Sequence, residues 1–258
     1  MKNGENHFFI NSSNIIAGIS ALILSLALSG CTCPAKQAGD ISKDETKIQL
    51  NGKDFSAWRG DTGTWQIVGQ AAIDPENKKL INTRPGSGIM VADGKGVYLF
   101  SKEEAGDLKA HVEFMVPRGS NSGVYFMGRY EIQIFDSFGV KTMRYSDCGG
   151  IYQRWDENRK PQGYEGTPPK VNASLPAGQW QSFDVIFRAP RFDQSGKKIA
   201  NARFEKVVHN GTLVQKNVEV TGPTRASPLE DEKPTGSLVL QGDHGPVAFR
   251  NIWIVKLP

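Results

Sequence analysis

Hydrophobic and polar residues alternate along much of the chain after residue 48, and no stretch there keeps a 3.6-residue apolar period. In Leu108–Val116, apolar residues take every second position, with Lys109, His111 and Glu113 between them. Such alternation is typical of a strand with one buried and one wet face. We therefore expect an all-β domain.

Further segments with strand character are separated by Gly, Pro, Asn and Asp: Thr64–Val68, Val97–Phe100, Gly123–Phe126, Tyr130–Phe135, Trp180–Phe187, Ala202–Val208, Thr212–Val220, Ser237–Gln241 and Val247–Lys256. Asn210-Gly211 lies between two of them and predicts a hairpin, because both central positions of a type I′ turn need positive φ. Gly86-Ser87-Gly88 is expected to be a turn. Many short strands with this punctuation indicate a jelly-roll β-sandwich.

Two segments, 158–176 and 222–235, are rich in Pro, Gly and charge and too long for simple turns. We expect loops, which either wall a site or decorate the surface.

The N-terminus carries an apolar run, Ile15–Leu28, that is too short to span a bilayer as a helix. It fits the hydrophobic region of a signal peptide over residues 1–30. The following Leu28-Ser29-Gly30-Cys31 resembles the bacterial lipobox, which implies acylation of Cys31. An ordinary secretory signal is the alternative.

Residues 31–47 are polar and predict a flexible tether, followed by a single domain over 48–258. Thr32 stands where inner-membrane lipoproteins commonly carry Asp. We therefore expect a cell-envelope protein, held at the outer membrane or facing the periplasm, that meets the membrane through its lipid anchor alone.

The formal charge of +4 is mild and its Lys and Arg are spread, so no nucleic-acid partner is expected. The three cysteines do not form a disulfide framework, and Cys148 reads as a small buried residue. No phosphate-binding loop, nucleophile elbow or histidine metal spacing is present. No organic cofactor is expected.

The segment Gly128–Asp136 carries the most informative pattern in the chain. Alternation puts its apolar residues on one face and three long polar side chains, Arg129, Glu131 and Gln133, on the other. Burying three such groups is costly, so this face is either exposed or lines a polar cleft.

Other polar residues, in 121–123 and 241–251, favour the cleft. Their concentration beside glycines is typical of sugar hydroxyl recognition, and aromatic rings are available to stack on pyranose rings: Tyr125, Tyr152, Trp155 and Tyr164.

Eight short motifs in this order resemble those of the 3-keto-disaccharide hydrolase family: Leu50–Trp58, Asn121–Gly123, Tyr130–Asp136, Gly150–Tyr152, Gln179–Gln181, Asn210-Gly211, Leu240-Gln241 and Phe249–Ile252. The resemblance implies a concanavalin A-like jelly roll, often exported. It also implies an oligosaccharide or glycoside substrate whose C3 hydroxyl a partner sugar 3-dehydrogenase has oxidised to a ketone. The segments 158–176 and 190–200 are insertions relative to shorter members.

A ketone at C3 acidifies the C2 proton, so a base can remove it and the enolate can expel the C1 substituent before water adds. Such a site needs a base, a partner for the enolate oxygen and an acid for the leaving group. We expect Glu131 as base, Arg250 or Arg129 at the enolate or substrate, and His244 as the proton shuttle. The other expected substrate-binding residues are Gln133, Asn121, Tyr152, Trp155 and Gln241.

A divalent cation is an alternative electrophile, with Glu131, Gln133 and Asp136 as candidate oxygen ligands. Straight alternation puts Asp136 on the face opposite Glu131, so a bulge would be needed to join them.

Two further functions stay open. Glu131-x-Gln133-x-x-Asp136 also resembles the Glu-x-Asp-x-x-Glu strand of retaining jelly-roll glucanases, with the middle carboxylate replaced. A lectin-like carbohydrate-binding module without catalysis is the other, since a fold does not fix a function.

Overall fold

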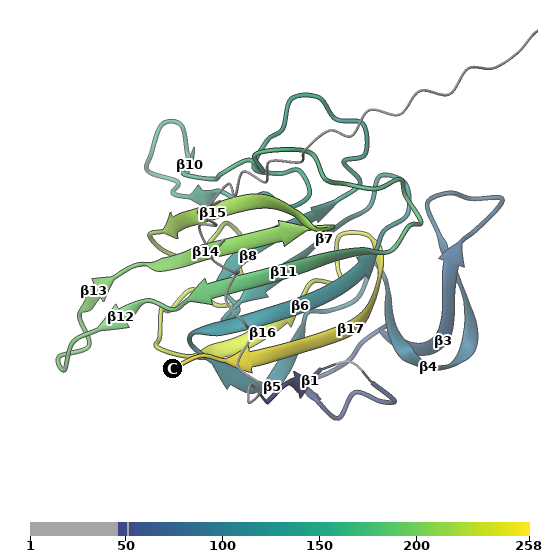
Figure 1. The fold of residues 1–258 in the computed structure, drawn as a ribbon, viewed down its shortest axis with the longest axis horizontal. Helices are drawn as coiled ribbons and strands as arrows, with labels where there is room; N and C mark the ends of the chain where they lie inside the picture. The colour runs from purple at the N-terminus through teal and green to yellow at the C-terminus, as the bar shows by residue number, and fades with distance from the viewer. Residues whose placement is uncertain (1–45, 51) are drawn as a thin grey trace, which may run out of the picture. The chain divides into compact units, whose positions relative to one another are not determined.

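The computed structural model describes residues 46–50 and 52–258, whose regular elements are all β-strands (Figure 1). The larger sheet has eight antiparallel strands, in the order β15 (Thr212–Val220), β14 (Ala202–His209), β11 (Gln181–Arg188), β6 (Leu108–Met115), β17 (Pro246–Lys256), β4 (Ile81–Asp93) and β3 (Gln66–Ile73), with β1 (Ile48–Gln49) pairing to β17. In this described part, no helix is long and apolar enough to cross a membrane.

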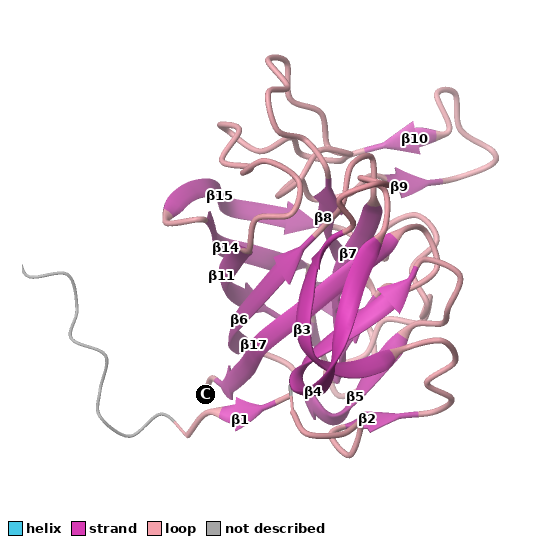
Figure 2. Ribbon diagram, turned by 90° about the vertical axis from the view of Figure 1, so that its right-hand side faces the viewer, coloured by secondary structure: helices cyan, strands magenta, loops and turns pink. Residues whose placement is uncertain are grey.

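The smaller sheet has five strands, in the order β2 (Trp58–Arg59), β5 (Leu99–Ala105), β16 (Gly236–Leu240), β7 (Asn121–Phe126) and β8 (Tyr130–Phe135). Two short hairpins stand outside the sheets: β9 (Arg154–Trp155) with β10 (Gly163–Tyr164), and β12 (Arg191–Phe192) with β13 (Lys198–Ala200). Figure 2 shows β9 and β10 beyond the ends of β7 and β8.

The two sheets pack face to face through a core of alternating apolar side chains. Phe126 of β7 meets Phe187 of β11 and Phe204 of β14, with ring centroids 5.3 Å apart in both pairs. Aromatic pairs at this separation add to the stability that burial alone supplies. The predicted all-β jelly-roll sandwich is confirmed.

Strand β8 follows the predicted alternation. Tyr130, Ile132 and Ile134 are fully buried in the core, while Glu131 and Gln133 point to the opposite face of the smaller sheet. Although β8 ends the sheet, the segment 149–152 runs along its free edge. There the backbone N–H of Gln133 donates to the Gly150 carbonyl at 2.9 Å. Edge pairing and core packing together fix the direction in which Glu131 and Gln133 point.

The predicted hairpin at Asn210-Gly211 is confirmed, since both residues have positive φ between β14 and β15. The predicted turn at Gly86-Ser87-Gly88 is wrong, because these residues lie within β4. There β3 and β4 shift register, and Gly86 crosses so close to Gly69 that a Cβ on either residue would overlap backbone. Glycine permits this close approach.

Candidate active site

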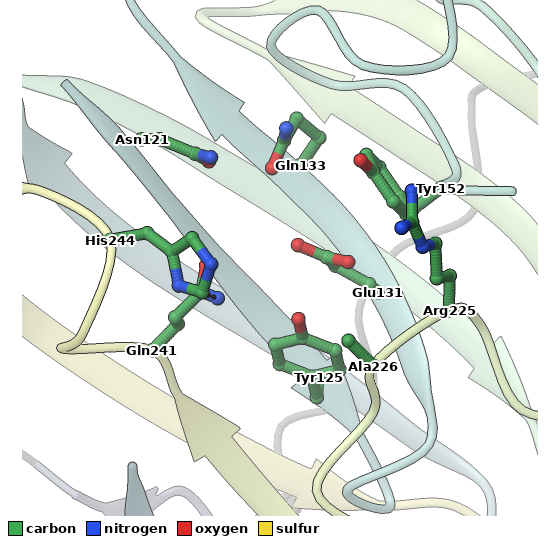
Figure 3. A pocket seen from close by; sticks show the side chains of 9 residues that line it. All are labelled: Asn121, Tyr125, Glu131, Gln133, Tyr152, Arg225, Ala226, Gln241 and His244. Carbon is green, nitrogen blue, oxygen red and sulfur yellow. Dashed lines mark hydrogen bonds between the residues drawn. The ribbon is translucent and has the colours of Figure 1, made fainter. Parts of the chain in front are cut away.

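A pocket of about 260 Å³ lies against the outer face of β7 and β8 (Figure 3). The two strands, the segment beside β8, the 222–235 segment and the residues after β16 all contribute to its lining: Asn121, Tyr125, Glu131, Gln133, Tyr152, Arg225, Ala226, Gln241 and His244. The fold thus brings together six of the residues that the sequence marked. The sequence suggested Tyr125 only as a ring for stacking on sugars, and it gave no signal for Arg225.

Glu131 is the deepest charged group of this pocket, with only 3% of its surface exposed. Its carboxyl group has room because Gly123 stands on the neighbouring strand, where a Cβ would overlap Glu131 Oε1. Burial raises the pKa of Glu131 to about 8, Asp243 adds to the rise through its charge, and a hydrogen bond from Tyr125 opposes it. Near neutral pH, this carboxyl group can therefore either accept or release a proton.

Tyr125 faces Glu131 directly across the β7–β8 pair and is almost fully buried. Its hydroxyl is hydrogen-bonded to Glu131 and to Tyr98. Burial raises the pKa of Tyr125 far above its ordinary value, so the hydroxyl stays neutral and keeps its proton for donation. Tyr98 in turn accepts a hydrogen bond from Gln241 Nε2 at 3.2 Å.

Three amide side chains of the pocket have buried oxygens without a hydrogen-bond partner: Asn121 Oδ1, Gln133 Oε1 and Gln241 Oε1. The Gln133 amide is oriented by its own Nε2, which donates to the Ser146 carbonyl at 3.2 Å. A buried acceptor without a donor costs free energy. These oxygens are therefore suited to a ligand that brings hydroxyl donors.

His244 lies across the pocket from Tyr152 and Arg225, beside Gln241 (Figure 3). Its Nδ1 is 2.6 Å from Asp243 Oδ1 and 3.0 Å from Gln241 Nε2, and about half of its side chain is exposed. The acidic neighbour orients the ring, as carboxylates do for histidines that exchange protons.

Arg129, which the sequence suggested as a substrate-binding residue, does not line the pocket. It follows a turn in which Met127 and Gly128 both have positive φ, which removes it from the alternation of β8. Its guanidinium is 2% exposed and donates to the carbonyls of Met127 and Asp231 and to the Asp231 carboxylate. Arg129 and its carbonyl, which accepts from the Thr224 amide at 2.8 Å, hold the 222–235 segment that carries Arg225.

Arg250 is also outside the pocket, because β17 belongs to the larger sheet. It pairs with Glu113 at 2.6 Å and stacks on the Trp180 ring at 4.0 Å. Trp155 lies on β9 and is separated from the pocket by Arg225, whose guanidinium packs 4.0 Å from its ring centre. The sequence could not show which sheet or hairpin each residue joins.

The three residues considered for a cation are not gathered in one place. Asp136 accepts the Gly119 amide at 2.9 Å and does not line the pocket with Glu131 and Gln133. Among residues 46–50 and 52–258, no group of three or more His, Cys, Asp or Glu is placed to hold a metal ion.

Residues 46–255 match the family described as 3-keto-alpha-glucoside-1,2-lyase-like domain. The chain belongs to this family. Membership of the 3-keto-alpha-glucoside-1,2-lyase-like family indicates a protein that acts on glycosides. The pocket described above lies within the matched residues.

Solved structures from Parabacteroides distasonis resemble this 3-keto-alpha-glucoside-1,2-lyase-like domain, and they are described as candidate glycosyl hydrolases. One is 25% identical with a TM-score of 0.61, covering 82% of this chain and 84% of its own. A second is 20% identical with a TM-score of 0.52, covering 82% and 100%, and supports the fold alone. No curated protein matches the chain.

Proposed function

We propose that this domain cleaves glycosides whose sugar ring carries a ketone at C3, by elimination followed by hydration, with Glu131 as the base. The observation that carries the proposal is the buried Glu131 carboxyl group, whose pKa is raised to about 8 at the floor of a polar pocket. A base of that pKa is well matched to proton abstraction near neutral pH. Family membership supplies the 3-keto glycoside as the substrate class.

In the first step, Glu131 takes the proton from C2, and the electron pair of that bond forms the C2–C3 double bond of an enolate. The enolate then re-forms the C3 ketone, makes a C1–C2 double bond and expels the C1 oxygen, which takes up a proton. In the second step, water adds its oxygen to C1 and a proton returns to C2. The net reaction consumes one water and releases the 3-keto sugar and the free leaving group.

Arg225 replaces Arg129 and Arg250 in the proposed role at the enolate oxygen, because it is the arginine that lines the pocket. Tyr152 lies near it, and burial raises the pKa of this tyrosine, which keeps its hydroxyl a neutral donor. Donors aimed at developing negative charge lower the barrier most where water is excluded. His244, on the opposite side, is the proposed acid for the leaving oxygen.

The two other functions raised by the sequence find less support. Retaining glucanases use two carboxyl groups about 5 Å apart, whereas Glu131 is the one carboxyl residue among those that line the pocket. In a module that only binds sugars, Glu131 would serve to hydrogen-bond hydroxyls, a role that does not require the raised pKa of its buried carboxyl group.

The test uses a chromogenic 3-keto-glucoside and its unoxidised parent, each with and without EDTA. We expect cleavage of the keto compound alone. Cleavage of the parent would favour the glucanase, and cleavage of neither would favour the binding module. Loss of activity with EDTA would reveal a required cation. Full activity in a Glu131→Gln variant would show that Glu131 is not the base.

We further propose that the domain is lipid-anchored through Cys31 in the cell envelope and acts after a sugar 3-dehydrogenase, because its substrate must first be oxidised at C3. Cys31 lies outside the described residues. Metabolic labelling with a radioactive fatty acid should mark the full chain and the Cys33→Ser variant, but not Cys31→Ser.

A further inference from the structure

A second pocket of about 590 Å³ lies beside the first, at the β9–β10 hairpin. Its lining shares no residue with the first pocket and comes mostly from the hairpin, including Trp155, Glu157, Arg159, Lys160 and Gln162. The proposed reaction uses none of these residues.

The two pockets are nevertheless built on a common wall. Tyr152 of the first pocket meets Tyr145 of the second edge to face, with ring centroids 5.3 Å apart. Arg225 of the first pocket packs on the Trp155 ring of the second at 4.0 Å, and its amide donates to the Gln153 carbonyl at 2.8 Å. The two pockets are therefore neighbours, and Arg225 and Tyr152 lie between them.

The Trp155 ring is held in place before any ligand arrives. Its Nε1 donates to Glu157 Oε1 at 2.7 Å, and Gln162 Nε2 donates to the other carboxylate oxygen at 2.8 Å. A fixed, half-buried indole offers a stacking surface at little cost in conformational entropy.

The charges of the second pocket indicate what kind of ring fits there. Both oxygens of Glu157 already have donors. Arg159, which lies 3.9 Å over the Tyr164 ring, and Lys160 are exposed and have no carboxylate partner in the described part of the chain. The pocket thus presents surplus donors beside an aromatic ring, a combination suited to an oxygen-rich ring rather than to a hydrocarbon.

We propose that the second pocket binds the leaving-group half of the glycoside, and that this half is a second sugar ring packed against Trp155. This inference rests on the proposed function, which identifies the bond that is broken. The glycosidic linkage would pass between the two pockets at Arg225 and Tyr152. Accordingly, the domain prefers substrates of at least two rings over glycosides of small alcohols.

The experiment compares a 3-keto-disaccharide with methyl 3-keto-glucoside on wild type, Trp155→Ala and the double variant Arg159→Ala/Lys160→Ala. We expect kcat/KM for the disaccharide to fall about tenfold in Trp155→Ala, which is about 1.4 kcal/mol, and about threefold in the double variant. The methyl glycoside should be cleaved at unchanged rates by the double variant, which leaves the shared wall intact. Trp180→Ala, on the larger sheet, is the matched control.

Calorimetric binding of the unoxidised disaccharide and methyl glucoside separates this inference from the proposed function. If no keto glycoside is cleaved, the proposed function fails, and tighter binding of the disaccharide that Trp155→Ala abolishes still supports the second pocket. Equal affinity of wild type for the two ligands would overturn the inference, as would equal losses on both keto substrates in the double variant.

Discussion

The Tyr125 hydroxyl donates a hydrogen bond to the Glu131 carboxyl group from the position directly opposite it on the neighbouring strand. Because this bond favours the charged carboxylate, it counteracts the rise in the Glu131 pKa that burial causes. The pKa of the proposed base is thus set by two opposing effects, burial and the Tyr125 hydrogen bond, which can be separated by mutation.

Tyr125→Phe should raise the pKa of Glu131 further, since the hydrogen bond that lowers it is lost. A hydrogen bond of about 1 kcal/mol corresponds to somewhat under one pKa unit, so kcat/KM at pH 7 should fall by about fivefold. The pH profile of a methyl 3-keto-glucoside assay measures the shift, with Tyr164→Phe as the control. A profile that keeps its acidic limb in place would show that Tyr125 does not act through Glu131.

Glu131→Gln should make the domain more stable at alkaline pH. The pKa of Glu131 is about 8 in the folded state against an ordinary 4.5, so the folded protein holds a proton that the unfolded chain releases between these values. The free energy of unfolding therefore falls as the pH rises from about 4.5 to 8, by at most a few kcal/mol. Denaturation at pH 5 and pH 8.5 should show this slope in wild type and in the exposed control Glu76→Gln, but not in Glu131→Gln.

Gly123→Ala should inactivate the enzyme without unfolding it. The added methyl group would overlap the Glu131 carboxyl group, so the base must leave its position. We expect a loss of at least about 100-fold in kcat and of about 1–3 kcal/mol in stability. Gly52→Ala is the matched control, because its Cβ meets no atom closer than 3.9 Å. Full activity in Gly123→Ala would contradict the placement of Glu131.

Arg129→Met should loosen the 222–235 segment. It leaves the carbonyls of Met127 and Asp231 without their buried donor, and we expect a loss of about 3 kcal/mol in stability. Hydrogen exchange should rise in residues 222–235. Arg250→Met removes an arginine of the other sheet and should keep activity and lose under about 1 kcal/mol. Equal exchange in both variants would remove Arg129 as the anchor.

Strand periodicity predicted β8 and β15 at their observed bounds, because the apolar residues on one face of each pack into the core and register follows the hydrophobic pattern. It also placed Glu131 and Gln133 on one face. It missed β4, since Pro85, Gly86 and Gly88 read as turn residues until their partner Gly69 is known.

The sequence suggested six of the pocket residues, on β8 and in other polar segments, but it could not tell which arginine joins them, because that depends on long-range contacts. Arg129, Arg225 and Arg250 look alike in sequence, and only the fold separates a buried anchor, a pocket residue and a surface ion pair. The raised pKa of Glu131 likewise comes from burial beneath segments that are distant along the chain.

The proposed base and the second pocket come from separate parts of the architecture. Glu131 lies on a sheet strand that packs against the core, whereas Trp155, Arg159 and Lys160 lie on a hairpin that belongs to neither sheet. The 156–162 loop can therefore diverge between relatives, or be exchanged in the laboratory, without moving the reacting group. With this division, changes confined to a short loop can alter which glycosides the domain accepts, while the sheet keeps the proposed base in place.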